Sequence, residues 1–527
     1  QAFPSGGVGG GPCACTDGET VWACSRDGTP DFVYRADGRP FGSDRAPARE
    51  GGLLPPGRVQ DLAAIPAADA GGERPVVCIA QRGRIVPVRN PEWNIDLPGE
   101  SETDFVDEIT FHDGRDGARL AAIPARRPRA VAVHLRRLFI LQGGIAAGDA
   151  ASVAVLPLAP DGRPAESAPS PLFDVPAGVD PCDMAIDAAG RFYLSDTVRN
   201  HVYRFSRDGR RLERTFGAAD AQTPGAWDPL SFHAPTRLAL RRAADGTERL
   251  LVVDSLGANR LTEWDAETGR YLRSYDSYQT FANSGWGPDP ERPAEIYIPG
   301  HGGWLQRYRV DTATGRWSLQ AVWPGLRSDR NLALNKFTVV RAGGRLYIAS
   351  EENATVYRLS DDGRALLLSA AILREPGATV FWSDANGNGE IDEEEKRPCP
   401  ELPPGVMTYH GQKWLADLSY CAIGQGTPDV WRLAPSSFDA HGNPVFTRWD
   451  KLLTDPVFVA RRTGTATALT GLNELADDFS SDWMQADGTP GASFYVQARG
   501  GRNFTANYGA QHKISRYDIG PDGPVCR

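Results

Sequence analysis

The sequence predicts an all-β protein made of repeated four-stranded sheets. The first observation is a pattern of four short apolar runs, separated by turn residues, that recurs roughly every 40 residues. The second is a composition rich in turn formers, with 57 Gly and 41 Pro in 527 residues. The third is the lack of a long amphipathic helix in the hydrophobic pattern. Because four antiparallel strands form one blade when such a pattern repeats, we expect a single β-propeller.

The clearest copy of the pattern spans residues 181–217. Its four apolar runs predict four strands, and Asp208-Gly209 between the last two supplies the positive φ of a tight hairpin turn. Comparable patterns begin at Pro235 and at Lys336. Each contains an apolar strand, a turn, a strand that ends near Asp or Ser, an aromatic strand and a D-G or T-G turn. The recurrence predicts that each copy is one blade.

The whole chain can be divided on this pattern. Residues 1–57 are expected to form an N-terminal arm and the strands that close the ring, with a strand from 19–37 completing the last blade. Residues 58–527 are expected to form the propeller, with eight blades favoured and seven as the alternative. In the first blade we expect the run RIVPVR, residues 84–89, to be the third strand.

One blade resembles a known repeat. The run DTVRNHVYRF, residues 196–205, is similar to the NHL repeat, and VVDSLGANRLTEW, residues 252–264, is a looser version. The resemblance implies an NHL-like propeller. NHL-type propellers include both enzymes and pure binding platforms, so the resemblance indicates the fold much more than the function.

Composition and charge restrict the partners and the compartment. The net charge is −10, and no cluster of Lys and Arg forms a stripe that could follow phosphates, so we expect no nucleic-acid partner. No apolar run of about 18 residues occurs, so we expect no transmembrane segment. The start QAFPSGGVGGG is typical of a mature terminus after signal cleavage. We therefore expect a protein that is secreted, periplasmic or on the cell surface.

Eight cysteines fit a compartment that permits disulfides. If the termini of a closed propeller meet in one blade, Cys526 can be bridged to Cys13, Cys15 or Cys24. A bridge between Cys399 and Cys421 is a second candidate. The alternative is that the cysteines are free, buried thiols.

The most specific chemical signal is an acidic loop at residues 384–395. It matches the calcium-loop pattern D-x-[DN]-x-[DN]-G-x5-E throughout, with Gly389 at the sharp turn. A hard cation takes six to eight oxygen ligands, and alternate residues of a tight loop point inward. The sequence therefore predicts calcium as the cofactor, with these ligand positions: Asp384, Asn386, Asn388, Glu390, Asp392 and Glu395.

The surroundings of this loop differ from those of an EF-hand or dockerin, which it resembles. A strand-like run precedes the loop, and Pro398 follows it closely. We therefore expect a single stabilising calcium loop within an insertion, residues 376–405, between the sixth and seventh blades. The alternative is an acidic, solvated turn that binds nothing.

A second constellation is expected around the propeller axis. Where a blade opens with P-x-x-apolar, the third residue should face the axis, which selects Ala130, Asp183, Arg237 and Lys336. Asp183, Arg237 and Lys336 could bind an anionic or zwitterionic ligand. The alternative is a self-neutralising network of ion pairs.

The sequence favours a non-enzymatic platform that binds a protein or an extracellular polymer. One alternative is a hydrolase or lyase at the pore mouth, using Asp183 with His233 or His410. The histidines show no H-x-H or H-E-x-x-H arrangement for zinc. Another alternative is a subunit of a surface filament or layer that assembles through the N-terminal arm.

Overall fold

The computed structural model forms β-sheets almost throughout its described residues, and its one helical segment is the 3₁₀ turn Glu393–Glu395. Seven of its sheets have four strands and one has six. No described helix is long and apolar enough to cross a membrane. The structure describes residues 13–25, 32–37, 39–42, 53, 55, 57–72, 74–83, 85–90, 95–100, 107–144, 150–218, 224–254, 260–276, 287–300, 304–324, 337–350, 354–375, 378–399, 413–423, 429–454, 480–486, 493–499, 513–520 and 523–526.

The chain divides into two compact units. The first contains residues 1–221, 229–255 and 259–276, and the second contains 222–228, 256–258 and 277–527. Each unit consists of antiparallel sheets whose strands follow one another in chain order, as a repeated blade pattern requires. The all-β architecture predicted from the sequence is therefore confirmed.

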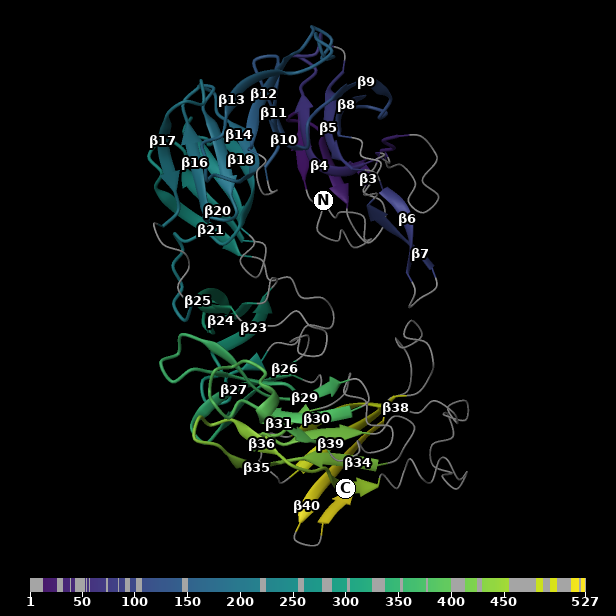
Figure 1. Ribbon diagram of the computed structural model, residues 1–527, viewed down its shortest axis with the longest axis vertical. Helices are drawn as coiled ribbons and strands as arrows, with labels where there is room; N and C mark the ends of the chain where they lie inside the picture. Colours follow the sequence, from purple (N-terminus) through teal and green to yellow (C-terminus); the bar gives the residue numbers. More distant parts are fainter. Residues whose placement is uncertain are drawn as a thin grey trace. The chain divides into compact units, whose positions relative to one another are not determined.

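Four sheets of the first unit have four strands each, and Figure 1 shows them following one another in chain order. Their strands are β4 (Arg58–Ile65), β5 (Val76–Arg82), β8 (Glu108–Asp113) and β9 (Arg119–Pro124); β10 (Pro128–His134), β11 (Arg137–Gln142), β12 (Ser152–Pro157) and β13 (Ser170–Asp174); β14 (Pro181–Ile186), β15 (Phe192–Asp196), β16 (His201–Phe205) and β17 (Leu212–Phe216); and β18 (Pro235–Arg242), β19 (Glu248–Asp254), β20 (Arg260–Asp265) and β21 (Tyr271–Asp276).

The predicted four-strand pattern at 181–217 is confirmed by β14 to β17. Gly209 sits in the predicted turn with φ +70°, and a Cβ there would lie 2.1 Å from Cδ1 of Phe173 in the preceding sheet. Glycine is therefore required both by the turn and by the neighbouring sheet.

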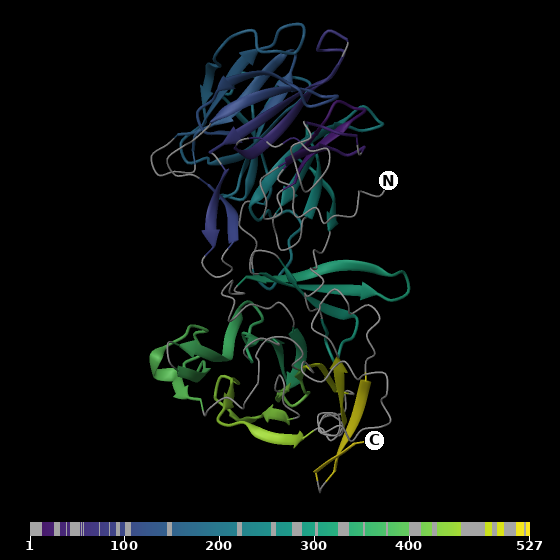
Figure 2. The same cartoon turned by 90° about the vertical axis from the view of Figure 1, so that its right-hand side faces the viewer.

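The first blade differs from its prediction. Residues 84–89 were expected to form its third strand, but β6 (Ile85–Asn90) pairs with β7 (Ile95–Glu100) in a separate two-stranded sheet. The third strand is β8, whose Phe111 pairs with Cys78 of β5. The β6–β7 hairpin is an excursion between β5 and β8, and it stands apart from their sheet in Figures 1 and 2. An apolar run alone does not reveal which sheet a strand joins.

The N-terminal strands also differ from expectation. β1 (Ala14–Thr16), β2 (Val21–Ser25) and β3 (Phe32–Arg35) form a three-stranded sheet of their own. The last sheet has four strands without them: β38 (Ser480–Ala486), β39 (Ser493–Arg499), β40 (Lys513–Gly520) and β41 (Gly523–Cys526). Among the described strands, the predicted pairing of an N-terminal strand with the last blade is not found.

The apolar core of the first unit lies between successive sheets. Phe192 of β15 packs edge to face against Phe139 of β11 and Phe173 of β13, with ring centroids 5.4 and 5.0 Å apart. Trp264 of β20 packs in the same way against Phe216 of β17. Phe173 is half-buried and the other four side chains are buried, and fully burying one such residue contributes about 1.5–3 kcal/mol. Aromatic residues facing both ways therefore bind each sheet to the next.

The second unit holds the remaining sheets. They comprise β22 (Gly287–Pro288), β23 (Glu295–Gly300), β24 (Trp304–Asp311) and β25 (Arg316–Pro324); β26 (Phe337–Ala342), β27 (Arg345–Ser350), β28 (Val356–Leu359), β29 (Leu366–Glu375), β30 (Ala378–Ser383) and β31 (Lys396–Pro398); β32 (Lys413–Trp414), β33 (Tyr420–Ile423), β34 (Asp429–Leu433) and β37 (Asp450–Thr454); the hairpin β35 (Pro435–Phe438) and β36 (Pro444–Phe446); and the last sheet. The segment that carries the acidic loop continues the β26–β29 sheet through β30 and β31.

Candidate functional site

The first strands of four successive blades share one irregularity. In β4, β10, β14 and β18 the register with the second strand shifts by one residue near the start of the strand. A bulge of this kind re-aims the side chain that follows it. The residues after the bulges are Asp61, Ala130, Asp183 and Arg237, and we call the three charged ones the bulge cluster.

Arg237 connects the two carboxylates of the bulge cluster. Its Nη1 lies 3.6 Å from Oδ1 of Asp61 and 3.6 Å from Oδ1 of Asp183. Its Nη2 donates to the carbonyl oxygen of Gln60 at 2.8 Å. Burial lowers the pKa of Arg237, but the combined effect of Asp183 and Asp61 is larger and raises it. The net shift is upward, so the guanidinium stays charged. β18 is thereby fixed to β4 by one side chain.

Each carboxylate also binds the backbone of the first strand in the following sheet. Oδ2 of Asp61 accepts the N–H of Val131 at 2.9 Å, and Oδ2 of Asp183 accepts the N–H of Leu238 at 2.7 Å. The two contacts are equivalent, since Val131 and Leu238 both directly follow a bulge position. A buried N–H without a partner is costly, so these carboxylates stabilise the fold by accepting backbone N–H groups at the edges of β10 and β18. Figure 1 shows the four strands β4, β10, β14 and β18 side by side.

The two carboxylates do not titrate normally. Burial and the nearby Asp183 raise the pKa of Asp61 to about 7, despite the opposing effect of Arg237. Burial also raises the pKa of Asp183, and Arg237 opposes this shift. Two buried acids beside one permanent cation therefore keep a proton to a higher pH than exposed carboxyls do, and Arg237 offsets part of their negative charge.

The sequence identified two of these three residues. Asp183 and Arg237, which the P-x-x-apolar rule selected, contact each other. Asp61 was missed because Val59 stands where the rule requires Pro, although the apolar run VQDLAAI has the same frame. Lys336, the third predicted ligand-binding residue, lies outside the described residues. The second carboxylate makes the local charge more negative than the predicted ring of Asp, Arg and Lys.

The histidines proposed for a pore-mouth enzyme are only partly described. The N–H of His233 donates to Oδ2 of Asp254 at 3.2 Å, and burial lowers the pKa of the imidazole. His410 lies outside the described residues. Among the residues that the structure describes, no group of three or more His, Cys, Asp or Glu side chains is placed to hold a metal ion.

The predicted calcium loop is a compact turn between β30 and β31. Three of the predicted ligands meet at one carboxylate oxygen, since the side-chain amides of Asn386 and Asn388 donate to Oδ2 of Asp392 at 2.7 and 3.0 Å. Glu395 is buried, with Oε1 accepting the N–H of Asn386 and Oε2 accepting Nε1–H of Trp382. The loop thus gathers side chains from positions 3, 5, 9 and 12 of the predicted pattern.

Asp384, the first position of the loop, is fully buried. Its Oδ1 accepts the N–H of Gly389 at 3.1 Å across the turn, and its Oδ2 lies 3.4 Å from Nη2 of Arg358. Gly389 has φ +75°, the left-handed conformation expected at the sharp turn. Glu390 donates its backbone N–H to Oδ1 of Asn388 at 2.7 Å, and its side chain is exposed. All six predicted positions therefore lie on one closed turn.

The acidic loop is fixed to the β35–β36 hairpin by Asn443. The Asn443 amide donates to the carbonyl oxygen of Asp384, and its Oδ1 accepts Nε–H of Arg358 at 2.6 Å and the hydroxyl of Ser369 at 2.7 Å. Asn443 is fully buried, and its amide also donates to Oδ2 of Asp439 at 3.1 Å. This network orients the start of the loop, although no sequence motif predicted it.

No disulfide joins the described cysteines. Cys399 and Cys421, one predicted pair, are both free thiols. Cys13, Cys15 and Cys24 also form no disulfide with a described residue, and the side chain of their predicted partner Cys526 lies outside the described residues. Cys13 and Cys24 instead contact each other across β1 and β2, where the N–H of Cys24 donates to the carbonyl oxygen of Cys13 at 3.0 Å.

Comparisons with known proteins add little to this geometry. No family model matches the chain, and no curated protein matches it. Among solved structures, a protein from Lactobacillus plantarum, determined by the Northeast Structural Genomics Consortium, is similar to 71% of this chain and 100% of its own, with 14% identity and a TM-score of 0.23. A TM-score this low does not establish a common fold.

Proposed function

We propose that the protein is an eight-bladed, NHL-like β-propeller that acts as a non-enzymatic binding platform for a protein or an extracellular polymer. Seven blades remain the alternative, and the proposed location is outside the cytoplasm or at the cell surface. The eight sheets with four or more strands support the blade number. The strands β15 and β16 carry the run that resembles the NHL repeat.

The observation that carries the platform proposal is the engagement of the two carboxylates in the bulge cluster. Asp61 and Asp183 each use one oxygen to bind the next strand, and both lie beside Arg237. A nucleophile or general base needs a carboxylate that is free to reach a substrate. Here these groups join blades, which suits a rigid scaffold that binds partners on its surface.

A calcium ion in the acidic loop is part of the proposal. The segment 384–395 carries six acidic and no basic residues, a surplus of negative charge that a hard cation would relieve. Asp384, Asn386, Asn388, Asp392 and Glu395 offer side-chain oxygens, and Glu390 offers its carbonyl. The amides of Asn386 and Asn388 would turn their oxygens, instead of their N–H groups, toward the ion. Bound calcium would stabilise the turn.

One observation favours a second candidate, a hydrolase or lyase. The pKa of Asp61, raised to about 7, would let this carboxyl hold a proton at neutral pH and act as a general acid, with Asp183 as its partner. A bell-shaped or acid-limited pH dependence of turnover would be its signature.

One experiment separates the two candidates. The full chain is immobilised, and acidic and neutral extracellular polysaccharides and proteins are passed over it while binding is recorded. Each bound polymer is then recovered and its length is measured by size-exclusion chromatography. The platform proposal expects saturable binding and unchanged length. Polymer that is shortened by the wild type and left intact by Asp183→Asn would establish the enzyme instead.

A further inference from the structure

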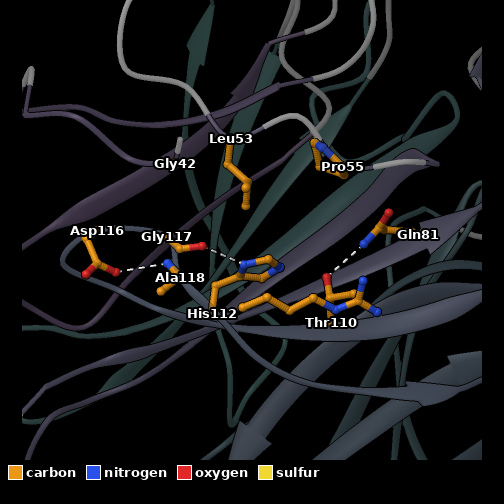
Figure 3. Close-up of a pocket in the computed structure, with 10 residues that line it drawn as sticks. Gly42, Leu53, Pro55, Gln81, Thr110, His112, Asp116, Gly117 and Ala118 are labelled. Atoms are coloured by element: carbon orange, nitrogen blue, oxygen red, sulfur yellow. Dashed lines mark hydrogen bonds between the residues drawn. The ribbon is translucent and has the colours of Figure 1, made fainter. Parts of the chain in front are cut away.

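A pocket of about 490 Å³ lies in the first unit, beside the β4–β5–β8–β9 sheet (Figure 3). Its floor includes Gln81 of β5 and Thr110 and His112 of β8, and Leu53 and Pro55 contribute apolar walls. Thr110 and His112 are two residues apart on one strand, so their side chains point to the same face of the sheet. No sequence motif marks this pocket.

The walls of the pocket are fixed by backbone contacts. The N–H of Gly42 donates to the carbonyl oxygen of Asp116 at 2.8 Å, and Leu53 exchanges two backbone hydrogen bonds of 2.8 Å with Val33. Gly117, at φ +77°, lies so close to Gly42 that a Cβ would be 2.6 Å from the Gly42 nitrogen. The pocket is therefore formed by packed chain and does not depend on a ligand to shape it.

His112 presents a hydrogen-bond acceptor to the pocket. Its Nδ1 lies 2.9 Å from the carbonyl oxygen of Gly117, which can only accept, so Nδ1 carries the hydrogen. The residue is 5% exposed, and burial together with Arg119 lowers the imidazole pKa, against the effect of Gly117. Nε2 therefore keeps its lone pair. It has no hydrogen-bond partner among the described residues, and Figure 3 shows it turned away from Gly117.

Thr110 presents a donor beside this acceptor. Gln81 is oriented by the N–H of Gly57, which donates to its Oε1 at 3.1 Å, and Nε2 of Gln81 then donates to Oγ1 of Thr110 at 2.7 Å. Because Thr110 already accepts through this bond, its own O–H remains to donate. A ligand hydroxyl satisfies both groups at once, since it can donate to His112 and accept from Thr110.

The charge at the rim points to an anionic group on the ligand. Arg119 lines the pocket with a half-exposed side chain, and its Nη2 lies 3.1 Å from Oε2 of Glu108. Asp116 also lines the pocket. The contact with Glu108 engages one of the five guanidinium N–H groups of Arg119, so the others can bind a ligand carboxylate, and the neighbouring Glu108 favours a monoanionic carboxylate over a doubly charged phosphate. Leu53 and Pro55 suit the C–H groups of a compact ligand.

We propose that this pocket binds a hydroxylated carboxylic acid of the size of a sugar acid, with a ligand hydroxyl between His112 and Thr110 and the carboxylate on Arg119. This inference goes beyond the proposed function and does not rest on it. All of its residues belong to the first unit, whereas the acidic loop belongs to the second.

The test uses the full chain with D-glucuronate and D-galacturonate as probes, and glucose and inorganic phosphate as comparisons. Binding is measured by isothermal titration calorimetry, and the imidazole nitrogens of His112 are followed by ¹⁵N NMR. We expect saturable binding of at least one sugar acid, about tenfold weaker binding of glucose, and a shift of the His112 Nε2 resonance.

Two variants and one control identify the site. Arg119→Gln and Thr110→Val should each weaken sugar-acid binding about tenfold, since each removes one polar contact. Arg115→Gln changes a residue of the same β8–β9 turn that does not line the pocket, and it should leave affinity within about twofold. Arg119 is on the surface, so its substitution should not impair folding.

Three results would overturn the proposal. The first is an absence of binding by both sugar acids. The second is phosphate or glucose binding as tightly as the acids. The third is equal affinity of the wild type and Arg119→Gln, which would place any bound acid elsewhere.

Discussion

Asp61 and Asp183 in the first unit and Asp384 in the second are buried carboxylates that each lie beside one arginine, but their surroundings balance charge differently. In the bulge cluster, Arg237 lies between two buried acids whose pKa values are raised, so the cluster contains its own cation. In the acidic loop, Arg358 lies beside Asp384 and Lys396 pairs with Glu393, and the segment holds four further acidic residues by position 395. The comparison sets a charge cluster that contains its own cation beside an acidic loop whose surplus of negative charge a cation would relieve.

The largest effect on stability is expected from removing the arginine of the bulge cluster. Arg237→Gln leaves two buried carboxylates without their cation, which should lower the free energy of unfolding by about 3–5 kcal/mol in urea at pH 8. Arg242→Gln, on the same strand with an exposed side chain, is the matched control and should change stability by under about 0.5 kcal/mol. Equal, small losses in both variants would mean that Arg237 does not balance the pair.

The next effect is a pH dependence specific to the bulge cluster. Because the pKa of Asp61 is raised to about 7, the folded state holds a proton that the unfolded state releases near pH 4. The stabilisation is thus fully present below about pH 4 and is lost as the pH rises toward 7, by an amount on the order of 2–4 kcal/mol.

Asp61→Asn tests this sign, because it removes the titrating group. The difference in unfolding free energy between wild type and variant should fall as the pH rises from 4 to 7, and urea titrations across that range measure it. Acids with lowered pKa values, such as Asp113 and Asp265, make stability rise with pH. They are present in both proteins, so their effect cancels in the difference between wild type and variant. A difference that is flat, or that rises with pH, would contradict the assignment.

The two regions also show what sequence can predict. The four strands at 181–217 follow directly from apolar runs and a D-G turn, and the sharp turn at Gly389 follows from the calcium-loop pattern. The sequence rule missed Asp61 because the position of the bulge, and not a Pro, determines which side chain joins the cluster. The β6–β7 excursion and the Asn443 network depend on contacts between segments far apart in the chain, which local patterns do not encode. The identity of a bound ion depends on chemistry beyond either pattern.

A smaller, ligand-dependent effect is expected in the acidic loop. At a calcium concentration of 100 times Kd, the second unit should gain about 2.7 kcal/mol, observed as a rise in Tm that EDTA reverses. Glu395→Gln, which alters a buried predicted ligand, should abolish this gain. Glu394→Gln changes an exposed neighbour and should preserve it. If calcium had the same effect on both variants, the ion would not bind through Glu395.

The smallest effect is expected from a substitution at Gly389, which changes the shape of the acidic loop without changing its charge. Gly389→Ala forces a Cβ into the left-handed region and to within 3.1 Å of Cδ2 of Leu367, whereas Gly344→Ala, at φ +78°, meets nothing within 4 Å. Backbone strain alone should cost about 1 kcal/mol in Gly344→Ala, with calcium stabilisation unchanged. Gly389→Ala should cost about 1 kcal/mol more and weaken the calcium response, because the strained turn also positions the N–H that Asp384 accepts. If the two variants lost the same stability and responded equally to calcium, the sharp turn at Gly389 would have no part in forming the ion site.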